Sequence, residues 1–387
     1  MSWEYKTLDQ LGEVSRGRSK HRPRNDPSLF GGKYPFIQTA DVKAANFYIT
    51  EYDTTYNEKG LAQSRLWNPG TLCITIAANI ADTGILAMDA CFPDSVMGFL
   101  PYEGIADVRF VKYCFDILQQ NCKKISQGAA QDNLSWEKLS TILFPAPPIE
   151  VQTKIADILS TYDNLIENNK KQIKLLEEAA QRLYKEWFVD LHFPGHETTP
   201  IVDGVPVGWR RERLVDLVDV QYGYAFDGSL FNTAKNGMPI IRIRNIPSGN
   251  TDDYTTEEAD SQYIVHNGDI LVGMDGEFHI NSWSGPDAYL VQRTCSFRPN
   301  NSEMKGYLLQ AIYEPIKYFE NTVVGATVAH LGKKHIDTIN VLTCPTNLYV
   351  PLQDYYEQRQ LLLNQNWLLA EARDRLLPKL MSGEIEV

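Results

Sequence analysis

The sequence lacks the usual markers of secretion, membrane insertion and zinc binding. Its six cysteines include no C-x-x-C pair, and scattered thiols in a chain of 387 residues predict a reduced, intracellular protein without a disulfide framework. No apolar run approaches the roughly 18–20 residues of a membrane span. The residues after Met1 begin no apolar signal segment. We therefore expect a folded cytoplasmic protein without a membrane partner.

Catalytic motifs are missing as well. The chain contains no Gly-x-x-x-x-Gly-Lys phosphate loop, no Gly-x-Ser-x-Gly elbow and no His-Glu-x-x-His metal motif. Its seven histidines are mostly isolated from one another. The absence of these motifs predicts a binding protein with no catalytic residues, no metal site and no cofactor of its own.

Positive charge is scarce overall, because 37 Lys and Arg residues face 49 Asp and Glu residues. A net charge of −12 at first argues against nucleic acid as a partner. The acidity is uneven, however: residues 1–148 hold 15 basic and 16 acidic residues, whereas residues 196–347 hold 12 and 19. The balance therefore does not exclude DNA, but it predicts weak DNA binding by the isolated chain, above all by its second half.

One feature that is present is an internal repeat of about half the chain. The segment from Trp3 to Leu8 resembles that from Trp209 to Leu214, and Gly128 to Leu134 resembles Gly325 to Leu331. Short β-branched and aromatic runs bounded by Gly, Pro and Asn predict strands, with helical stretches between them. The predicted fold class is α+β, with two repeated mixed α/β domains separated by a long two-helix antiparallel coiled coil. The predicted parts are residues 1–148, 149–195, 196–347 and 348–387.

The two spacer segments carry apolar residues at a seven-residue period, as coiled coils do. Asn169 interrupts the first segment and Asn366 the second. Placing the two asparagines opposite each other fixes an antiparallel register, in which the one poor match is Leu176 against Arg359. The alternative is an ordinary helical hairpin that only packs. The residues predicted to form the coiled coil are Leu159, Ile166, Asn169, Ile173, Leu176, Leu183, Leu362, Asn366, Leu369 and Leu376.

A basic loop in the first repeat is a candidate site for binding nucleic acid. Five cations and no acidic residue fall between positions 16 and 24, and such a loop suits contacts to DNA phosphates. The alternative is a solvated surface loop. Arg pairs with guanine, and Asn or Gln with adenine, through edge contacts. The resulting candidates for binding double-stranded DNA are Arg16, Arg18, Lys20, Arg22, Arg24, Gln38, Gln127, Gln131, Tyr222, Tyr224, Arg242, Arg244, Asn245, Lys333, Lys334 and His335.

Three ordered stretches resemble one known family. They run from Pro147 to Ile155, from Leu183 to Trp209 through Pro194-Gly195, and from Leu376 to Glu384. They resemble the specificity subunits of Type I restriction–modification systems, and the resemblance covers the whole chain. It implies that residues 1–148 and 196–347 are target-recognition domains, each reading half of a bipartite DNA target. The segments 149–195 and 348–387 would be the central and distal spacer helices that set the gap.

The resemblance also implies the partners. Two modification subunits would bind the helices and carry S-adenosylmethionine, and restriction (motor) subunits that use ATP and Mg²⁺ would join for cleavage. This chain would then select the sequence without catalysing a reaction. A protein-scaffolding module, with two α/β units gripping proteins, is the alternative. A stand-alone nuclease would require metal-dependent cleavage by the purified chain, which we do not expect.

Overall fold

A computed structural model describes residues 3–76, 82–125, 136–322 and 329–387. The chain forms two compact units: unit 1 comprises residues 1–167 and 369–387, and unit 2 comprises residues 168–368. Both units include part of two long helices, α6 (Ile149–Tyr184) and α11 (Val350–Met381). A π-helical turn at Lys185–Val189 follows α6 directly, within the predicted spacer segment 149–195. The predicted mixed α/β class is confirmed, whereas the four-part domain division stays a prediction.

Unit 1 is built on a five-stranded sheet. Its strand order is β2-β8-β6-β7-β4, and helix α4 (Val108–Ile125) supplies Phe110 and Phe115 to the core beside it. The strands β6 and β7 are buried along their whole length, which explains their continuous apolar sequence. The strands are β2 (Gly12–Arg16), β4 (Tyr48–Ile49), β6 (Leu72–Thr75), β7 (Thr83–Leu86) and β8 (Val96–Pro101), and a separate pair joins β1 (Glu4–Lys6) to β9 (Phe144–Ala146).

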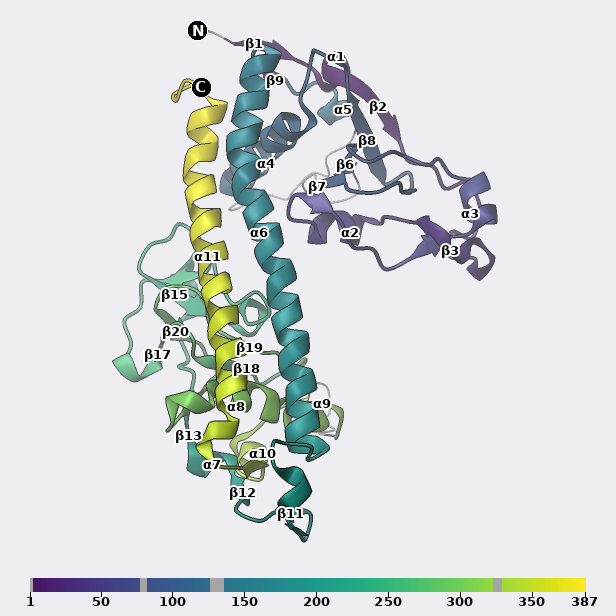
Figure 1. Cartoon of the computed structure of the whole chain (residues 1–387). Helices are drawn as coiled ribbons and strands as arrows, with labels where there is room; N and C mark the ends of the chain where they lie inside the picture. The colour runs from purple at the N-terminus through teal and green to yellow at the C-terminus, as the bar shows by residue number, and fades with distance from the viewer. Residues whose placement is uncertain (1–2, 77–81, 126–135, 323–328) are drawn as a thin grey trace. The chain divides into compact units, whose positions relative to one another are not determined.

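A smaller part of unit 1 projects away from this sheet (Figure 1). It has its own core, in which the rings of Phe36 and Tyr56 stack with their centroids 4.0 Å apart. Its elements are η1 (Pro27–Leu29), the strands β3 (Phe30–Pro35) and β5 (Thr55–Tyr56), and the helix α3 (Glu58–Ala62). The other short helices of unit 1 are α1 (Leu8–Leu11), α2 (Thr39–Ala44) and α5 (Trp136–Leu139).

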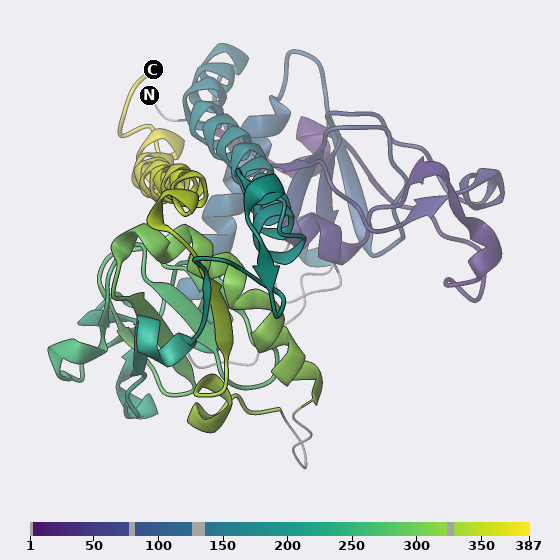
Figure 2. The same ribbon diagram turned by 60° about the horizontal axis from the view of Figure 1, so that its bottom comes forward.

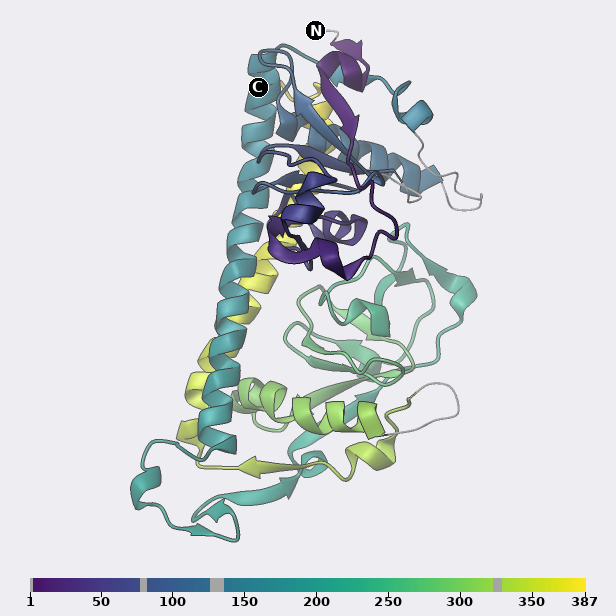
Figure 3. The same cartoon turned by 90° about the vertical axis from the view of Figure 1, so that its right-hand side faces the viewer.

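Unit 2 has a four-stranded sheet of order β13-β21-β18-β19 and a second sheet of order β14-β16-β15-β20-β17. Helices α8 (Lys305–Ala311) and α9 (Tyr313–Thr322) follow each other beside the first sheet (Figures 2 and 3). The strands of the first sheet are β13 (Val218–Tyr222), β18 (Ile270–Gly273), β19 (Ile280–Ser282) and β21 (Thr294–Pro299). Those of the second are β14 (Phe231–Asn232), β15 (Met238–Ile241), β16 (Tyr254–Thr255), β17 (Ile264–Val265) and β20 (Ala288–Leu290).

Smaller elements complete unit 2. The remaining strands are β10 (Ile201–Val202) paired with β11 (Val205–Pro206), and β12 (Arg210–Arg213) paired with β22 (Asn340–Thr343). The remaining helices are α7 (Leu214–Leu217) and α10 (Lys333–Ile336). Further single turns lie at η3 (His196–Thr198), η4 (Gly228–Leu230), η5 (Ile243–Asn245), η6 (Ser261–Tyr263), η7 (Ser302–Met304) and η8 (Thr346–Leu348).

The internal repeat is confirmed in the strand register. In unit 1, β2 pairs with β8 so that Val14 lies opposite Phe99. In unit 2, β13 pairs with β21 so that Val220 lies opposite Phe297. In both units the third strand, β6 or β18, then pairs with the other side of the second strand. The two halves therefore share one strand topology, and equivalent loops can be compared directly.

Candidate nucleic-acid interface and spacer helices

The basic loop leaves the end of β2 at a tightly packed glycine. The backbone N–H of Gly17 donates to the carbonyl of Val96 at 2.8 Å, and that of Arg18 donates to Phe92 at 3.0 Å. A Cβ at Gly17 would lie 2.3 Å from the carbonyl oxygen of Pro93, so only glycine fits. The sheet thus anchors the start of the loop, and all five predicted cations of the loop are exposed.

The five cations differ in their partners. The guanidinium of Arg22 donates to the carbonyls of Ser19 at 2.6 Å and His21 at 2.8 Å, so it holds the loop together. Arg24 forms an exposed ion pair with Asp94 at 2.7 Å. Among the described residues, the side chains of Arg16, Arg18 and Lys20 form no ion pair and are the cations available to phosphates.

The far end of the loop is held by a carboxylate. Asp26 accepts a hydrogen bond from the backbone N–H of Ser28 at 2.9 Å and contacts the ring of His21 at 2.7 Å. The bonds from Ser28, followed by that from His21, lower the pKa of Asp26 to about 2. The loop is therefore fixed at both ends. Arg18 and Lys20 lie between these ends, and Arg16 is the last residue of β2.

The equivalent position in unit 2 has the same anchor and different side chains. Gly223 donates its N–H to Thr294 at 3.0 Å, and a Cβ there would lie 2.1 Å from the carbonyl oxygen of Val291. Tyr222 and Tyr224 flank this glycine and are half-buried. Burial raises the pKa of Tyr222 to about 12. The ring of Tyr224 packs against other aromatic rings, at 4.8 Å from Phe226 and 5.2 Å from Tyr263.

A second pair of predicted DNA-binding positions is also equivalent. The backbone N–H of Gln38 donates to Asp41 at 2.6 Å, and that of Arg242 donates to the side-chain oxygen of Asn245 at 2.9 Å. Asn245 therefore caps a helical turn with the oxygen that would otherwise read a base. Arg244 engages the largely buried carboxylate of Asp253 through Nε at 3.2 Å and Nη2 at 2.6 Å. A guanine base would have to compete with the carboxylate of Asp253 for the guanidinium of Arg244.

The cluster at α10 is partly structural. Lys333 pairs with Asp337 at 2.9 Å. The ring of His335 stacks on Phe319 and its Nδ1 accepts the N–H of Gly332 at 3.0 Å. Burial, followed by the charge of Lys334, lowers the pKa of His335, so the ring is neutral at neutral pH. Lys334 is exposed and forms no ion pair with any residue in the described part of the chain.

Sequence reasoning missed two further side chains beside this cluster, His330 and Arg293. His330 contacts Asp275 at 2.5 Å, and the guanidinium of Arg293 lies 3.5 Å from the same carboxylate. Arg293 has a φ of +69°, which holds its side chain out at a turn. Nothing in the sequence around Arg293 marks that turn. The predicted residues Gln127 and Gln131 lie outside the described residues.

The helices α6 and α11 run antiparallel within each unit, and the predicted seam residues line their contact. Asn169 is 6% exposed and donates to Gln365 at 3.2 Å, so its partner is the neighbour of Asn366 and not Asn366 itself. The side-chain oxygen of Asn366 is buried with no hydrogen-bond partner among the described residues. The other seam residues are buried or half-buried: Leu159, Ile166, Ile173, Leu176, Leu183, Leu362, Leu369 and Leu376.

Arg359 was the one poor match in this predicted seam, and Arg373 is a second arginine two heptads further along the same helix. The Nε of Arg359 donates to Glu177 of α6 at 2.6 Å, and Arg373 bonds Asp163 of α6. Both arginines therefore face α6 and are compensated by its carboxylates. Sequence reasoning missed these partners because it paired each arginine only with the seam residue of α6. The carboxylates that bind them, Glu177 and Asp163, lie one position after a seam residue.

Apolar side chains are exposed on the outer faces of the same helices. In unit 2, Leu175 and Leu361 are each 62% exposed, and Leu368 is 57% exposed. An open cleft of about 410 Å³ lies between the helices there, lined by Gln172, Leu175, Leu176, Gln358, Leu361 and Leu362. In unit 1, Ile158 and Leu165 of α6 are 38% and 46% exposed. Exposed apolar residues gathered on one element are typical of protein-binding surfaces.

The described ranges, 3–76, 82–125, 136–322 and 329–387, contain neither a candidate membrane span nor a cluster of metal ligands. No helix there is both long and apolar enough to cross a membrane. No group of three or more His, Cys, Asp or Glu side chains there is arranged to hold a metal ion.

One family model matches both halves of the chain. The family described as Type I restriction modification DNA specificity domain matches residues 1–178 and 206–347. The Type I restriction enzyme MjaIX specificity subunit of Methanocaldococcus jannaschii is 26% identical over 413 residues, which cover 100% of this chain and 94% of that protein. The EcoBI specificity subunit of Escherichia coli is 30% identical over 176 residues, which cover 45% of this chain and 33% of that protein.

The fold has a counterpart among solved structures. It is similar to the crystal structure of a Type-I restriction-modification system S subunit from M. genitalium. The TM-score is 0.55 and the identity 14%, over 98% of this chain and 96% of that chain.

Proposed function

The chain belongs to the family of Type I restriction–modification DNA specificity domains. From this premise we propose the roles of its two recognition domains and of its two long helices. As the specificity subunit of such a system, it reads a bipartite DNA target, one half-site by each recognition domain. The helices α6 and α11 set the gap between the half-sites. The chain itself catalyses neither methylation nor cleavage.

The observation that carries the proposal is the repeated loop anchor. Gly17 and Gly223 lie at the same point of the same strand topology, each directly after its strand and close to a backbone carbonyl oxygen, that of Pro93 or Val291. One anchor presents a cationic loop and the other presents tyrosines. Two equivalent surfaces with different side chains suit a target whose two halves differ in sequence.

The charges favour DNA binding within a complex. Three unpaired cations of the basic loop serve phosphates in the first domain, whereas Arg244 and Lys333 of the second are already paired with carboxylates. With a net charge of −12, the chain alone binds DNA weakly. Partner subunits therefore supply much of the phosphate contact.

Exposed leucines on the spacer helices support binding of partner subunits. Leu175, Leu361 and Leu368 form an apolar surface with a cleft beside it, which suits a helix of another protein laid against the spacer. Two modification subunits dock on the helices and bring S-adenosylmethionine. Restriction subunits, which use ATP and Mg²⁺, join that assembly for cleavage.

A methylation map tests this function directly. The chain and its modification subunit are expressed together, and modified adenines are located in the host DNA by single-molecule sequencing. We expect one target of two short specified segments separated by a fixed unspecified gap. A second expression with only residues 1–148 exchanged for those of a relative should change one segment and keep the other.

Two outcomes would contradict the proposal. Absence of sequence-specific methylation would argue for a scaffolding role, in which both units bind proteins. A target that changes in both segments after the exchange would show that the recognition domains do not act separately.

A further inference from the structure

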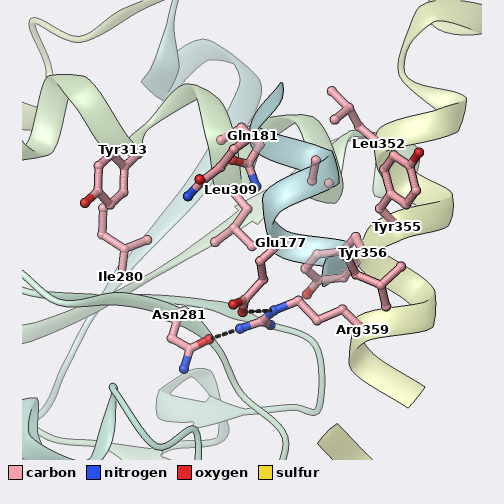
Figure 4. Close-up of a pocket in the computed structure, with 14 residues that line it drawn as sticks. Glu177, Gln181, Ile280, Asn281, Leu309, Tyr313, Leu352, Tyr355, Tyr356 and Arg359 are labelled. Carbon is pink, nitrogen blue, oxygen red and sulfur yellow. Dashed lines mark hydrogen bonds and ion pairs between the residues drawn. The ribbon is translucent and has the colours of Figure 1, made fainter. Parts of the chain in front are cut away.

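Each unit contains one buried polar junction that ties three elements together. In unit 2, Arg359 of α11 bonds three groups: Glu177 of α6 through Nε at 2.6 Å, Ser282 through Nη1 at 2.7 Å, and Asn281 through Nη2 at 2.7 Å. Figure 4 shows the bonds to Glu177 and Asn281. Arg359 is 8% exposed, and its contacts border a cavity of about 140 Å³. Because Asn281 and Ser282 belong to β19, the edge strand of the four-stranded sheet, the junction joins the domain to both helices.

The residue next to Arg359 completes this junction. Gln360 accepts a hydrogen bond from the hydroxyl of Ser282 at 2.8 Å and donates to the carbonyl of Trp283 at 2.6 Å. The hydroxyl of Ser282 therefore donates to one side chain of α11 and accepts from the other. Arg359, Ser282 and Gln360 are thus linked by buried hydrogen bonds, and such a buried network favours one geometry.

Unit 1 repeats the arrangement with other residues. Arg373 of α11 bonds Asp163 of α6, and Asp163 also accepts from the hydroxyl of Tyr113 on α4 at 2.6 Å and from Asn46 at 3.4 Å. Asp163 is 1% exposed. Burial beside this carboxylate raises the pKa of Tyr113, so its hydroxyl remains a donor. Again one arginine, one carboxylate and the recognition domain meet.

The two junctions have matching spacing on both helices. Asp163 and Glu177 are fourteen residues apart on α6, and Arg359 and Arg373 are fourteen apart on α11. Fourteen residues are two heptads of a coiled coil. A slip by one heptad would set Glu177 against Leu352 and Arg359 against Lys170, so buried or half-buried charges would lose their partners. Unpaired buried charge is strongly unfavourable, whereas an apolar seam alone would tolerate the slip.

We propose that the two junctions, Arg359–Glu177 and Arg373–Asp163, fix the register of α6 against α11 and the seating of each recognition domain, and thereby determine which gap between half-sites is accepted. This rests on the proposed function and assigns these four side chains as positioning residues for gap selection. They contact no base. Apolar residues hold the helices together, and the charged pairs select one alignment.

The experiment removes charge without removing volume. The paired variants E177M/R359M and D163M/R373M are each expressed with the modification subunits. Each complex is assayed for methylation on DNAs in which the two mapped half-sites are separated by the wild-type gap or by one base pair more or less. The control variant E371M/R375M removes an i,i+4 ion pair from α11 in which Arg375 is 77% exposed, so the loss of charge is the same.

We expect the half-site sequences to stay unchanged. The ratio of methylation at the wild-type gap to that at altered gaps should fall about tenfold or more in each paired variant, because a hydrogen bond to a charged group changes an equilibrium by at least that factor. Thermal stability should be kept or raised, since apolar replacement of a buried ion pair is often neutral or stabilising. The control should keep the wild-type ratio.

An unchanged ratio in both paired variants would overturn the inference, because a purely structural role moves stability and not gap preference. If a paired variant fails to assemble, E177Q and D163N provide the same measurement with nearly unchanged shape, and an unchanged ratio there has the same meaning. A wild-type complex that methylates no DNA would instead contradict the proposed function. The two failures are thus distinguishable.

Discussion

The basic loop gives a quantitative prediction, because its five cations fall into two groups. Arg16, Arg18 and Lys20 form no ion pair among the described residues, whereas Arg22 bonds loop carbonyls and Arg24 pairs with Asp94. We therefore compare the triple variant R16Q/R18Q/K20Q with the double variant R22Q/R24Q. Glutamine keeps a polar side chain of similar reach and removes the charge.

The magnitude follows from counterion release. Each phosphate neutralised contributes about 0.9 to the slope of log K against log salt on double-stranded DNA, so three lost contacts lower the slope by about 2.7. When the salt concentration rises from 50 to 200 mM, the triple variant should therefore lose roughly 40-fold less affinity for DNA than the wild type loses. The double variant should lower the slope by less than half as much, because its arginines are already engaged within the protein.

Fluorescence anisotropy of labelled target DNA, titrated with the complex of this chain and its modification subunits, measures both slopes. Circular dichroism melting checks that each variant is folded. An unchanged slope in the triple variant, or a larger change in the double variant, would refute the assignment of the three free cations to phosphates.

Three other predictions concern the anchor, the far end of the loop and the spacer. Gly17→Ala should lower the free energy of unfolding by about 1–3 kcal/mol, as overpacking does, in chemical denaturation, whereas Gly228→Ala, with open space around its Cβ position, should stay within about 0.5 kcal/mol of wild type. Asp26 has a folded pKa of about 2 against an ordinary value of 3.8, so its contribution to stability is full above pH 3.8 and is lost as the pH falls toward 2. Melting curves of D26N measured over a pH series should lack this acid-dependent loss of stability. A pH series identical to that of the wild type would contradict the assignment. L175D/L361D should reduce co-purification of the modification subunit while the melting temperature of the isolated chain stays unchanged, and undiminished co-purification would place the docking surface elsewhere.

Much of the fold could be predicted because its signals are local. Heptad periodicity located α6 and α11, since a long amphipathic helix repeats its apolar face every few residues. The repeat indicated equivalent strands, and the register of Val14 with Phe99 and of Val220 with Phe297 agrees with it. The projecting part of unit 1 was not predicted, because a strand as short as β5 (Thr55–Tyr56) carries too little pattern to stand out.

The candidate site could be predicted only as a set of loops. The sequence placed Arg22 and Arg16 in one loop with equal weight, yet Arg22 bonds two carbonyls of that loop and Arg16 forms no ion pair among the described residues. Asn245 and Gln38 were expected to face bases, and Asn245 instead caps a turn with its oxygen. Hydrogen bonds between residues far apart in sequence decide these roles, and no local pattern encodes them.

The sequence by itself therefore determined the architecture: two copies of one α/β unit, two long helices and a basic loop in the first copy, all set by local periodicity and repeated motifs. Tertiary structure alone decided which charges are free and which are engaged. Arg359 and Arg373 look like faults in an apolar seam when the helix is read alone. They become partners of Glu177 and Asp163 once folding brings residues 182 and 210 positions apart within hydrogen-bonding distance. A buried charge is tolerated only where another segment supplies its counter-charge.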